Sequence, residues 1–319
     1  TRSMKTFIFS ALALGVMAGC SNTEIEDVVD SGEPVAITLN AGVETAVVVG
    51  TRAAIGTDEL FKATVLGWEG DNVADYKVAP TWTAISSDIK ASSEVTNNIT
   101  LTNTQYYKSD GTHTFMKAFY VNGETPVADT DSWIYNLTKK DGTLDILMAS
   151  AINGDKNTPA ASFAFKRPLT KLIFKVVAGD GLADNVTLTS IEVKDMCVPE
   201  KINLGTDEVV FGETLATPLS IGVTASTSIT ATETPVGHAI MVKPIAGTFV
   251  ISVTTSTKTY DNVTVTLNSV AEHLDGAGVA YTVTLTFKEQ ISVSASVADW
   301  SEGTGSACLL YTSPSPRDC

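Results

Sequence analysis

Few side chains in this sequence stand in a pattern that supports catalysis. The three histidines, His113, His238 and His273, lack the H-E-x-x-H spacing that binds zinc. The chain has no G-x-S-x-G nucleophile motif, no phosphate-binding loop and no G-x-G-x-x-G motif. Two of the 36 acidic side chains could pair as in a glycosidase, but pairing is a spatial property that the sequence leaves open. We expect no enzyme activity, no metal site and no cofactor.

Cys20 is the side chain with the clearest chemistry, because it ends a secretion signal. Lys5 precedes an apolar run from Phe7 to Val16, which is too short to span a bilayer as a helix. Residues 17–20, Met-Ala-Gly-Cys, resemble a bacterial lipobox, in which the cysteine thiol is acylated and becomes the new N-terminus. We therefore expect a lipoprotein signal peptide over residues 1–19 and lipidation, with palmitate, of Cys20. An ordinary signal peptide with an incidental cysteine is the alternative.

Arg52 is the second residue of interest, because arginine is scarce. The chain has arginine only at positions 2, 52, 167 and 317. An arginine-specific protease would therefore find one obvious target near the N-terminus, the bond between Arg52 and Ala53. Cleavage there would release residues 20–52, which comprise a polar, acidic tether and a strand-like segment.

The sequence pattern predicts β-strands throughout the body of the chain. Apolar residues alternate with Thr, Ser or Asn, which is typical of strands with one buried face. The clearest segments are 35–43, 249–253, 263–267, 281–287 and 291–297, and further strands are expected at 63–68, 76–82, 115–121, 144–150, 169–178 and 188–193. No crossover helices separate these segments. We therefore predict an all-β fold of sandwich type.

The length of the chain indicates the number of domains, and its net charge excludes one class of partner. The 319 residues suffice for about two domains, and the most polar break, 153–160, predicts domains at 53–157 and 158–303. Residues 304–319 change composition abruptly and resemble translated vector sequence, so we expect them to be a non-native tail outside the fold. The 36 acidic and 21 basic residues give a net charge of −15, which has the wrong sign for nucleic-acid binding.

The best alternating strands lie at the two ends of the predicted body. The first would bury one face of a removable strand, made of Val35, Ile37, Leu39, Ala41 and Val43. Its loss would open an apolar groove with unpaired backbone groups, which a strand of another subunit could fill. Residues 291–300 are the candidate donor strand, with Ile291, Val293, Ala295 and Val297 on one face. Head-to-tail filling of this kind does not close, so it produces a filament.

The tryptophans leave a second function open. Trp68, Trp82, Trp133 and Trp300 could form a platform on which sugar rings stack. Trp68 and Trp82 lie within or at the ends of expected strands, where tryptophan more often belongs to the core. The alternative function is a non-polymerising surface lipoprotein with a glycan-binding β-sandwich.

Taken together, these segments resemble the fimbrillin family, the type V pilins of Bacteroidales. The resemblance rests on the lipobox, on a strand followed by Thr-Arg-Ala at 51–53, on the strands 145–149 and 165–176, and on the ending formed by 281–287 and 291–300. It implies two tandem transthyretin-like Greek-key β-sandwich domains in an adhesive pilus subunit. It also implies a lipoprotein precursor in the cell outer membrane, acylated at Cys20.

The resemblance further implies how such a subunit matures and what it meets. An arginine-specific protease would cut between Arg52 and Ala53, and donor-strand exchange would then build the cell-surface fimbrium. Other fimbrial subunits are the expected partners, in a homopolymer or a mixed pilus. A host protein or glycan is a possible adhesion ligand, and no nucleic acid is expected.

Overall fold

The fold is built from β-strands. The computed structural model describes residues 34–43, 59–71, 75–92, 95–288, 291–298 and 306–309. All regular secondary structure in these ranges is β, which confirms the all-β prediction. Within the same ranges no helix could cross a membrane. The described residues belong to one compact unit.

The strands are numbered in chain order. They are β1 Leu39–Val43, β2 Leu60–Phe61, β3 Thr64–Gly70, β4 Trp82–Ile85, β5 Ile89–Lys90, β6 Thr96–Ile99, β7 His113–Asn122, β8 Val127–Ala128, β9 Ile134–Asn136, β10 Asp145–Gly154, β11 Ser162–Lys166, β12 Thr170–Ala178, β13 Thr187–Val193, β14 Pro199–Asn203, β15 Glu208–Phe211, β16 Leu219–Ser220, β17 Thr227–Ser228, β18 Thr234–Val242, β19 Thr248–Thr255, β20 Thr259–Thr266, β21 Ala280–Phe287, β22 Ile291–Ala298 and β23 Ser306–Leu309.

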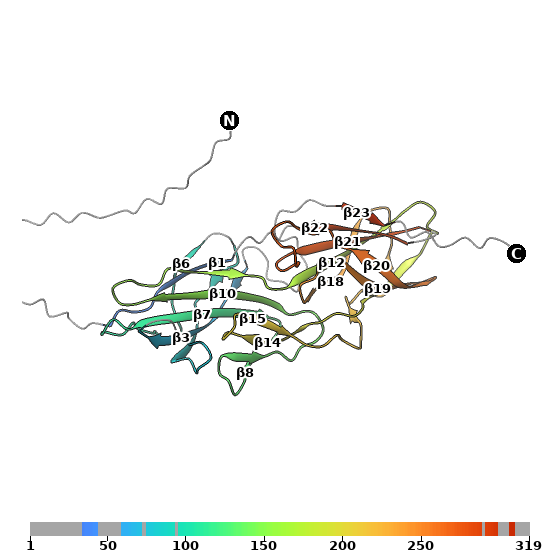
Figure 1. Ribbon diagram of the computed structural model, residues 1–319. Helices are drawn as coiled ribbons and strands as arrows, with labels where there is room; N and C mark the ends of the chain where they lie inside the picture. Colours follow the sequence, from blue (N-terminus) through green and yellow to red (C-terminus); the bar gives the residue numbers. More distant parts are fainter. Residues whose placement is uncertain are drawn as a thin grey trace, which may run out of the picture. The chain divides into compact units, whose positions relative to one another are not determined.

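The first half of the chain forms a seven-stranded sheet with the order β4-β3-β7-β10-β11-β1-β6. In Figure 1 its strands are coloured from blue to green. The inward side chains of β1, β3, β7, β10 and β11 share one apolar cluster, in which Phe61 and Phe165 meet edge to face with ring centres 5.3 Å apart. The short pair β2 and β5 supplies Phe61 and Ile89 to this core.

The second half packs two sheets face to face. One sheet has the order β18-β12-β21-β22-β23, and the other has the order β16-β13-β19-β20. Leu172 and Phe174 of β12 meet Ile191 of β13 and Ile251 of β19 in a single buried cluster, so the two sheets form a sandwich. The strands at 249–253, 281–287 and 291–297 appear where their alternation predicted them.

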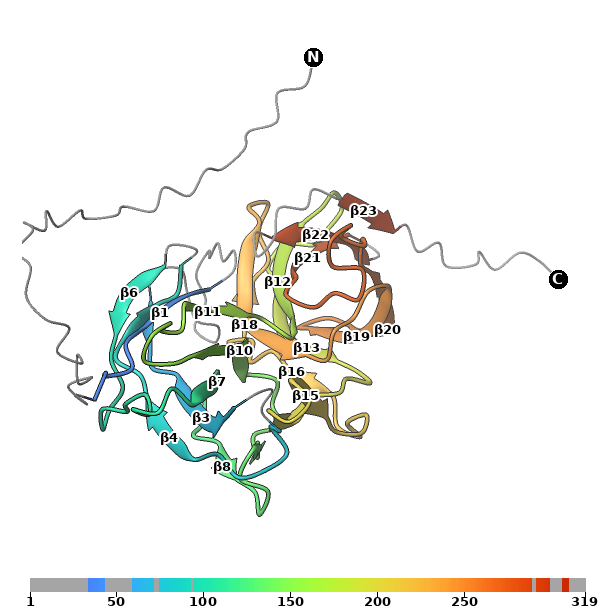
Figure 2. The same ribbon diagram turned by 60° about the vertical axis from the view of Figure 1, so that its left-hand side comes forward.

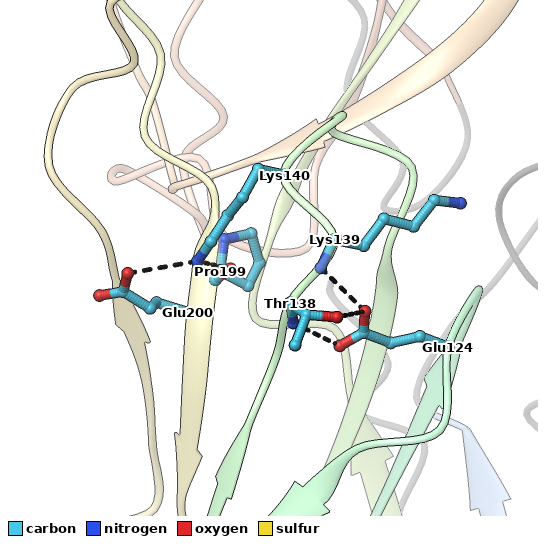
Figure 3. Close-up of polar contacts among 6 residues, drawn as sticks. All are labelled: Glu124, Thr138, Lys139, Lys140, Pro199 and Glu200. Atoms are coloured by element: carbon cyan, nitrogen blue, oxygen red, sulfur yellow. Dashed lines mark hydrogen bonds and ion pairs between the residues drawn. The ribbon is translucent and has the colours of Figure 1, made fainter.

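A four-stranded sheet, β15-β14-β9-β8, joins strands of both halves. Ile202 of β14 lies opposite Tyr135 of β9, and both side chains are buried in a third apolar cluster. Polar contacts at this junction are drawn in Figure 3, where the Lys140 ammonium approaches the Glu200 carboxylate at 3.3 Å. Alongside it, the Glu124 carboxylate accepts a hydrogen bond from the Thr138 amide at 2.8 Å.

A buried lysine also links the two halves at this junction. Lys117 of β7 donates from its Nζ to the Leu204 carbonyl at 2.6 Å and lies 2.7 Å from the Asp207 carboxylate. The same ammonium sits 3.8 Å above the Tyr76 ring. Burial, together with the charge of Asp207, raises the pKa of Tyr76. Since β7 belongs to the seven-stranded sheet and Leu204 follows β14, Lys117 connects the two halves of the chain.

Two strand predictions were wrong, and each error has a local cause. Residues 76–82 form a turn that continues to β4, because Asp75 accepts a hydrogen bond from the Lys77 amide at 2.9 Å and Pro80 lacks an amide donor. The strand 165–176, named for the family resemblance, is divided into β11 and β12 with Pro168 in the break, whereas the expected strand 169–178 matches β12. The boundary at 157–158 and the tandem transthyretin-like arrangement stay predictions.

The chain end contributes one more strand. Residues 306–309 lie in the expected non-native tail, and their backbone forms β23, which pairs antiparallel with β22. Cys308 opposes Ser294 in this pairing. Cys197, the cysteine whose surroundings are described, is a free thiol and half-buried.

Candidate functional site: the position of strand β1

Strand β1 is an inner strand of the seven-stranded sheet. It runs parallel to β11, with Asn40 opposite Ser162 and Val43 opposite Phe165. On its other edge it runs antiparallel to β6, with Leu39 opposite Ile99. Figure 2 shows β1 between these two neighbours. β1 and β11 lie far apart in the sequence, because two parallel strands cannot be joined by a short turn.

The contacts of this segment extend beyond β1 itself. Ala36 forms an isolated bridge with Tyr106, and the Ile37 amide donates to the Gln105 carbonyl at 2.8 Å. At the other end, the Val43 amide donates to the Ser92 carbonyl at 2.9 Å. The Asn98 amide donates to the Asn40 side chain at 3.2 Å. The segment is therefore held along its length, from Ala36 to Val43.

Four of the five predicted inward side chains are buried. Ile37, Leu39, Ala41 and Val43 are each at most 2% exposed, and they belong to the first apolar cluster. Val35 is the exception, because 39% of it is exposed. The alternation in the sequence therefore identifies the buried face from Ile37 onward.

The burial of this face indicates how strongly the segment is held. Burying an aliphatic side chain contributes about 1.5–3 kcal/mol, so Ile37, Leu39 and Val43 together contribute about 5–9 kcal/mol. Removal of the segment would expose the apolar cluster over Phe163 and Phe165 and leave β11 and β6 each without one partner strand. Such a position accepts any strand that restores both ladders and refills the apolar face.

The predicted processing and lipidation residues lie outside the described residues. These are Cys20, Arg52 and Ala53. The next arginine, Arg167, is described, and its side chain is only 2% exposed. Its guanidinium lies 2.6 Å from the carboxylate of Asp145, which is equally buried. An arginine-specific protease therefore has no access to Arg167 in the folded chain.

Arg167 belongs to a buried charged group at the connection between β11 and β12. Lys171 is the third member and is 2% exposed. Burial lowers the pKa of Lys171 to about 8, while Asp145 acts in the opposite direction and Arg167 in the same direction. This group anchors the strand that pairs in parallel with β1.

The candidate donor strand lies in a different sheet from β1. All eight residues of β22 pair antiparallel with β21, from Ile291 opposite Phe287 to Ala298 opposite Ala280. Val293 and Ala295 are buried in the core of the second half. Val297 opposes Tyr281 in the same pairing. The structure therefore does not bring β22 and β1 together within one chain.

The aromatic platform required by the glycan alternative is not present among the described tryptophans. Trp68 is buried in the third cluster, and its indole donates to the Val78 carbonyl at 2.9 Å. Trp133 packs against that same cluster, whereas Trp82 packs against the first. These three side chains are not exposed together, and Trp300 lies outside the described residues. Nor does any group of three or more His, Cys, Asp or Glu in the described ranges form a metal site.

A family comparison decides how this arrangement is interpreted. The model of a family described as fimbrillin-like matches residues 51–300. The chain belongs to the fimbrillin-like family. Membership points to a fimbrial or cell-adhesion subunit at the cell surface, which associates with other fimbrial subunits. A comparison of this fimbrillin-like chain with curated proteins found no match.

Similar solved structures come from Bacteroides and Porphyromonas species. A candidate cell adhesion protein from Bacteroides uniformis matches with a TM-score of 0.50 at 21% identity, over 83% of this chain and 99% of that chain. A fimbrial protein from Bacteroides vulgatus matches with a TM-score of 0.46 at 16% identity, over 83% and 99%. The fimbrial anchor protein Mfa2 from Porphyromonas gingivalis matches with a TM-score of 0.45 at 11% identity, over 83% and 98%. At 21% identity the likeness to the Bacteroides uniformis protein shows the fold alone.

Sequence reasoning missed the strands that hold β1. β11 is a short alternating segment, Ser-Phe-Ala-Phe-Lys, whose alternation was available as a signal. β6 has the sequence Thr-Asn-Asn-Ile, which is too polar and too short to predict a strand. The buried Lys117 was missed as well, although its place among apolar residues on both sides in β7 could have drawn attention to it.

Proposed function

We propose that this fimbrillin-like chain is a structural subunit of a cell-surface fimbria that polymerises by donor-strand exchange and supports adhesion. The subunit is exported as a lipoprotein precursor, acylated at Cys20 and attached to the outer membrane. An arginine-specific protease cuts after Arg52, and the strand containing residues 35–43 leaves. A strand from another subunit then takes its place.

The observation that carries this proposal is the position of β1. A strand at the edge of a sheet could leave and expose one row of backbone groups. β1 lies between β11 and β6, so its loss exposes two rows and an apolar face at once. The chain connection after β1 leads toward Arg52, so one cut separates this strand from the rest of the body.

The buried Arg167 supports the choice of Arg52. Because its side chain is buried and paired with Asp145, cleavage at Arg167 requires unfolding. An arginine-specific protease can therefore process the folded precursor near its N-terminus without dividing the body. The scarcity of arginine therefore favours selective cleavage at Arg52.

The donor strand must be released from its own sheet. In the proposed exchange, β22 leaves β21, and Val293 and Ala295 leave the core of the second half. They become buried again on the apolar face that β1 vacated in the next subunit. The burial that β22 loses in its own subunit is regained in the next one, so the exchange is close to balanced in apolar burial, and removal of β1 opens the position that accepts the strand. Each subunit both gives and receives a strand, and this heterologous contact extends as a filament.

Incubation of the purified precursor with an arginine-specific protease tests the proposal. We expect cleavage after Arg52, an N-terminal sequence that begins at Ala53, and ladders of oligomers in electron micrographs and in gels run without boiling. The matched control is Arg52→Lys, which keeps the charge and removes the cleavage site. It should remain monomeric under the same conditions.

Two outcomes would count against the proposal. A chain cut after Arg52 that remains monomeric at high concentration would exclude polymerisation of this kind. Ladders formed equally by Arg52→Lys would show that processing at this bond is not the trigger. On cells, an acylated Cys20 as the only N-terminus would indicate an anchored, non-polymerising lipoprotein.

A further inference from the structure

The inward side chains of β1 differ in size. Ala41 is 0% exposed and lies directly opposite Phe163 on β11. Residues paired in register point to the same face of a sheet, so the small side chain of Ala41 lies beside the large ring of Phe163. The neighbouring inward residues, Leu39 and Val43, are larger. Ala41 is thus the smallest of the inward side chains, and it is fully buried, whereas the larger Val43 lies opposite Phe165.

The candidate donor strand repeats this order of sizes. Its alternate residues are Ile291, Val293, Ala295 and Val297, against Ile37, Leu39, Ala41 and Val43 in the segment that is removed. In both, alanine is third and is flanked by branched residues. The segment from Ala36 to Val43 has eight residues, and β22 also has eight. Neither segment carries a charge, although the whole chain has a net charge of −15.

We propose that Ala295 of a second copy occupies the position of Ala41, against Phe163, and that this small residue sets the register of strand exchange. The inference rests on the proposed function and adds a specificity-determining position to it. The incoming strand runs parallel to β11, as β1 does, and antiparallel to β6. In this register Ser294 takes the place of Asn40, where its hydroxyl can accept the hydrogen bond from the Asn98 amide.

Other registers are disfavoured for two separate reasons. A shift by two residues places Val293 or Val297 at the position of Ala41, and the added methyl groups overpack the site beside Phe163. A shift by an odd number turns the serines of β22 inward and the apolar residues outward. Burying Ser292, Ser294 and Ser296 in an apolar cluster would leave hydroxyl groups without partners. One register therefore satisfies both size and polarity.

Peptide binding separates this inference from the proposed function. The chain is processed with the arginine-specific protease, and fluorescent peptides spanning residues 290–299 are titrated against it. Three peptides are compared: the unchanged sequence, Ala295→Leu, and the matched control Ser292→Leu, which in this register takes the place of the exposed Thr38. We expect Ala295→Leu to bind about 5- to 150-fold more weakly than the unchanged peptide, the range typical of an overpacked core. Ser292→Leu should change binding by less than about threefold.

A compensating change in the acceptor completes the test. In a chain carrying Phe163→Ala, space opens at the position of Ala41, so the Ala295→Leu peptide should regain affinity relative to the unchanged peptide. If Ala295→Leu binds the unaltered chain as well as the unchanged peptide does, the register inference is wrong, while strand exchange itself stands. If the processed chain polymerises but binds none of the peptides, β22 is not the donor, and the inference is overturned with that assignment. If it neither polymerises nor binds peptides, the proposed function fails as well.

Discussion

Replacement of Lys117 by methionine tests the link between the two halves of the chain. Lys117→Met keeps an unbranched apolar stem of similar length and removes the ammonium. The change deletes the hydrogen bond to the Leu204 carbonyl, the contact with Asp207 and the contact with the Tyr76 ring. The backbone pairing of β7 with β3 and β10 does not involve the side chain.

The expected loss of stability follows from these three contacts. A buried carbonyl that loses its hydrogen bond costs about 1–3 kcal/mol. The cation–π contact contributes about 0.5–2 kcal/mol. Asp207 is 46% exposed, so the ion pair is screened by solvent and contributes at most about 1 kcal/mol. Removing a buried ammonium relieves its desolvation and offsets part of this sum, which leaves a net loss of about 2 kcal/mol.

Equilibrium unfolding in urea, followed by fluorescence and circular dichroism, measures this loss. A decrease of about 2 kcal/mol lowers the melting temperature by about 3 °C in a chain of roughly 300 residues, because the entropy of unfolding grows with chain length. The matched control is Asp207→Asn, which removes only the exposed carboxylate charge. Asparagine also tolerates the left-handed backbone of residue 207, where φ is 57°. This control should lose less than about 1 kcal/mol.

Two results would refute the reasoning about Lys117. If Lys117→Met unfolds at the wild-type urea concentration, the buried hydrogen bond does not stabilise the junction. If Asp207→Asn destabilises the chain as much as Lys117→Met does, the exposed ion pair rather than the buried carbonyl is the main contact. A transition that separates into two steps in Lys117→Met would extend the reasoning, because it would show that this lysine couples the unfolding of the two halves.

Three further predictions concern other described positions. Burial lowers the pKa of Lys171 to about 8, so the native state loses this proton at a lower pH than the unfolded state does. The free energy of unfolding should therefore rise between about pH 8 and pH 10. Lys171→Met should abolish this rise in urea titrations. In Gly154→Ala the new Cβ would lie 2.2 Å from the Ala160 backbone nitrogen, so we expect the free energy of unfolding to fall by at least about 2 kcal/mol in thermal unfolding. The control Gly70→Ala should change it little, because nothing lies within 4 Å of the new Cβ there. In Gly67→Ala the Cβ would lie 2.1 Å from the Trp82 ring, and we expect the displaced indole to give red-shifted fluorescence; an unchanged emission spectrum would contradict this packing.

The strands of the second half were the most predictable part of the fold. Alternation over seven or eight residues identified β21 and β22, because each strand has one face in a continuous core. Short polar strands such as β6 carry no such signal, since their place depends on pairing with β1 rather than on their own composition. The division of the expected strand at Pro168 could have been anticipated from its missing amide donor.

The candidate site was predictable in part. The inward face of β1 followed from alternation, and the structure buries Ile37, Leu39, Ala41 and Val43 as that pattern required. Nothing in the sequence showed that β11 and β6 would enclose this strand, or that Phe163 would lie opposite Ala41. The exposed Val35 was missed because a pattern of alternation does not reveal where the cover of neighbouring strands ends.

By itself, the sequence determined the β character of the chain, the inward and outward faces of its strands, its acidic charge and the scarcity of arginine. These are local or compositional properties that each segment carries alone. Tertiary structure decided that β1 is enclosed on both edges, that Arg167 is buried against Asp145, and that β9 and β14 share one sheet. The physical reason is that strand pairing joins residues far apart in sequence, and the choice of partner depends on how all the apolar faces are buried together.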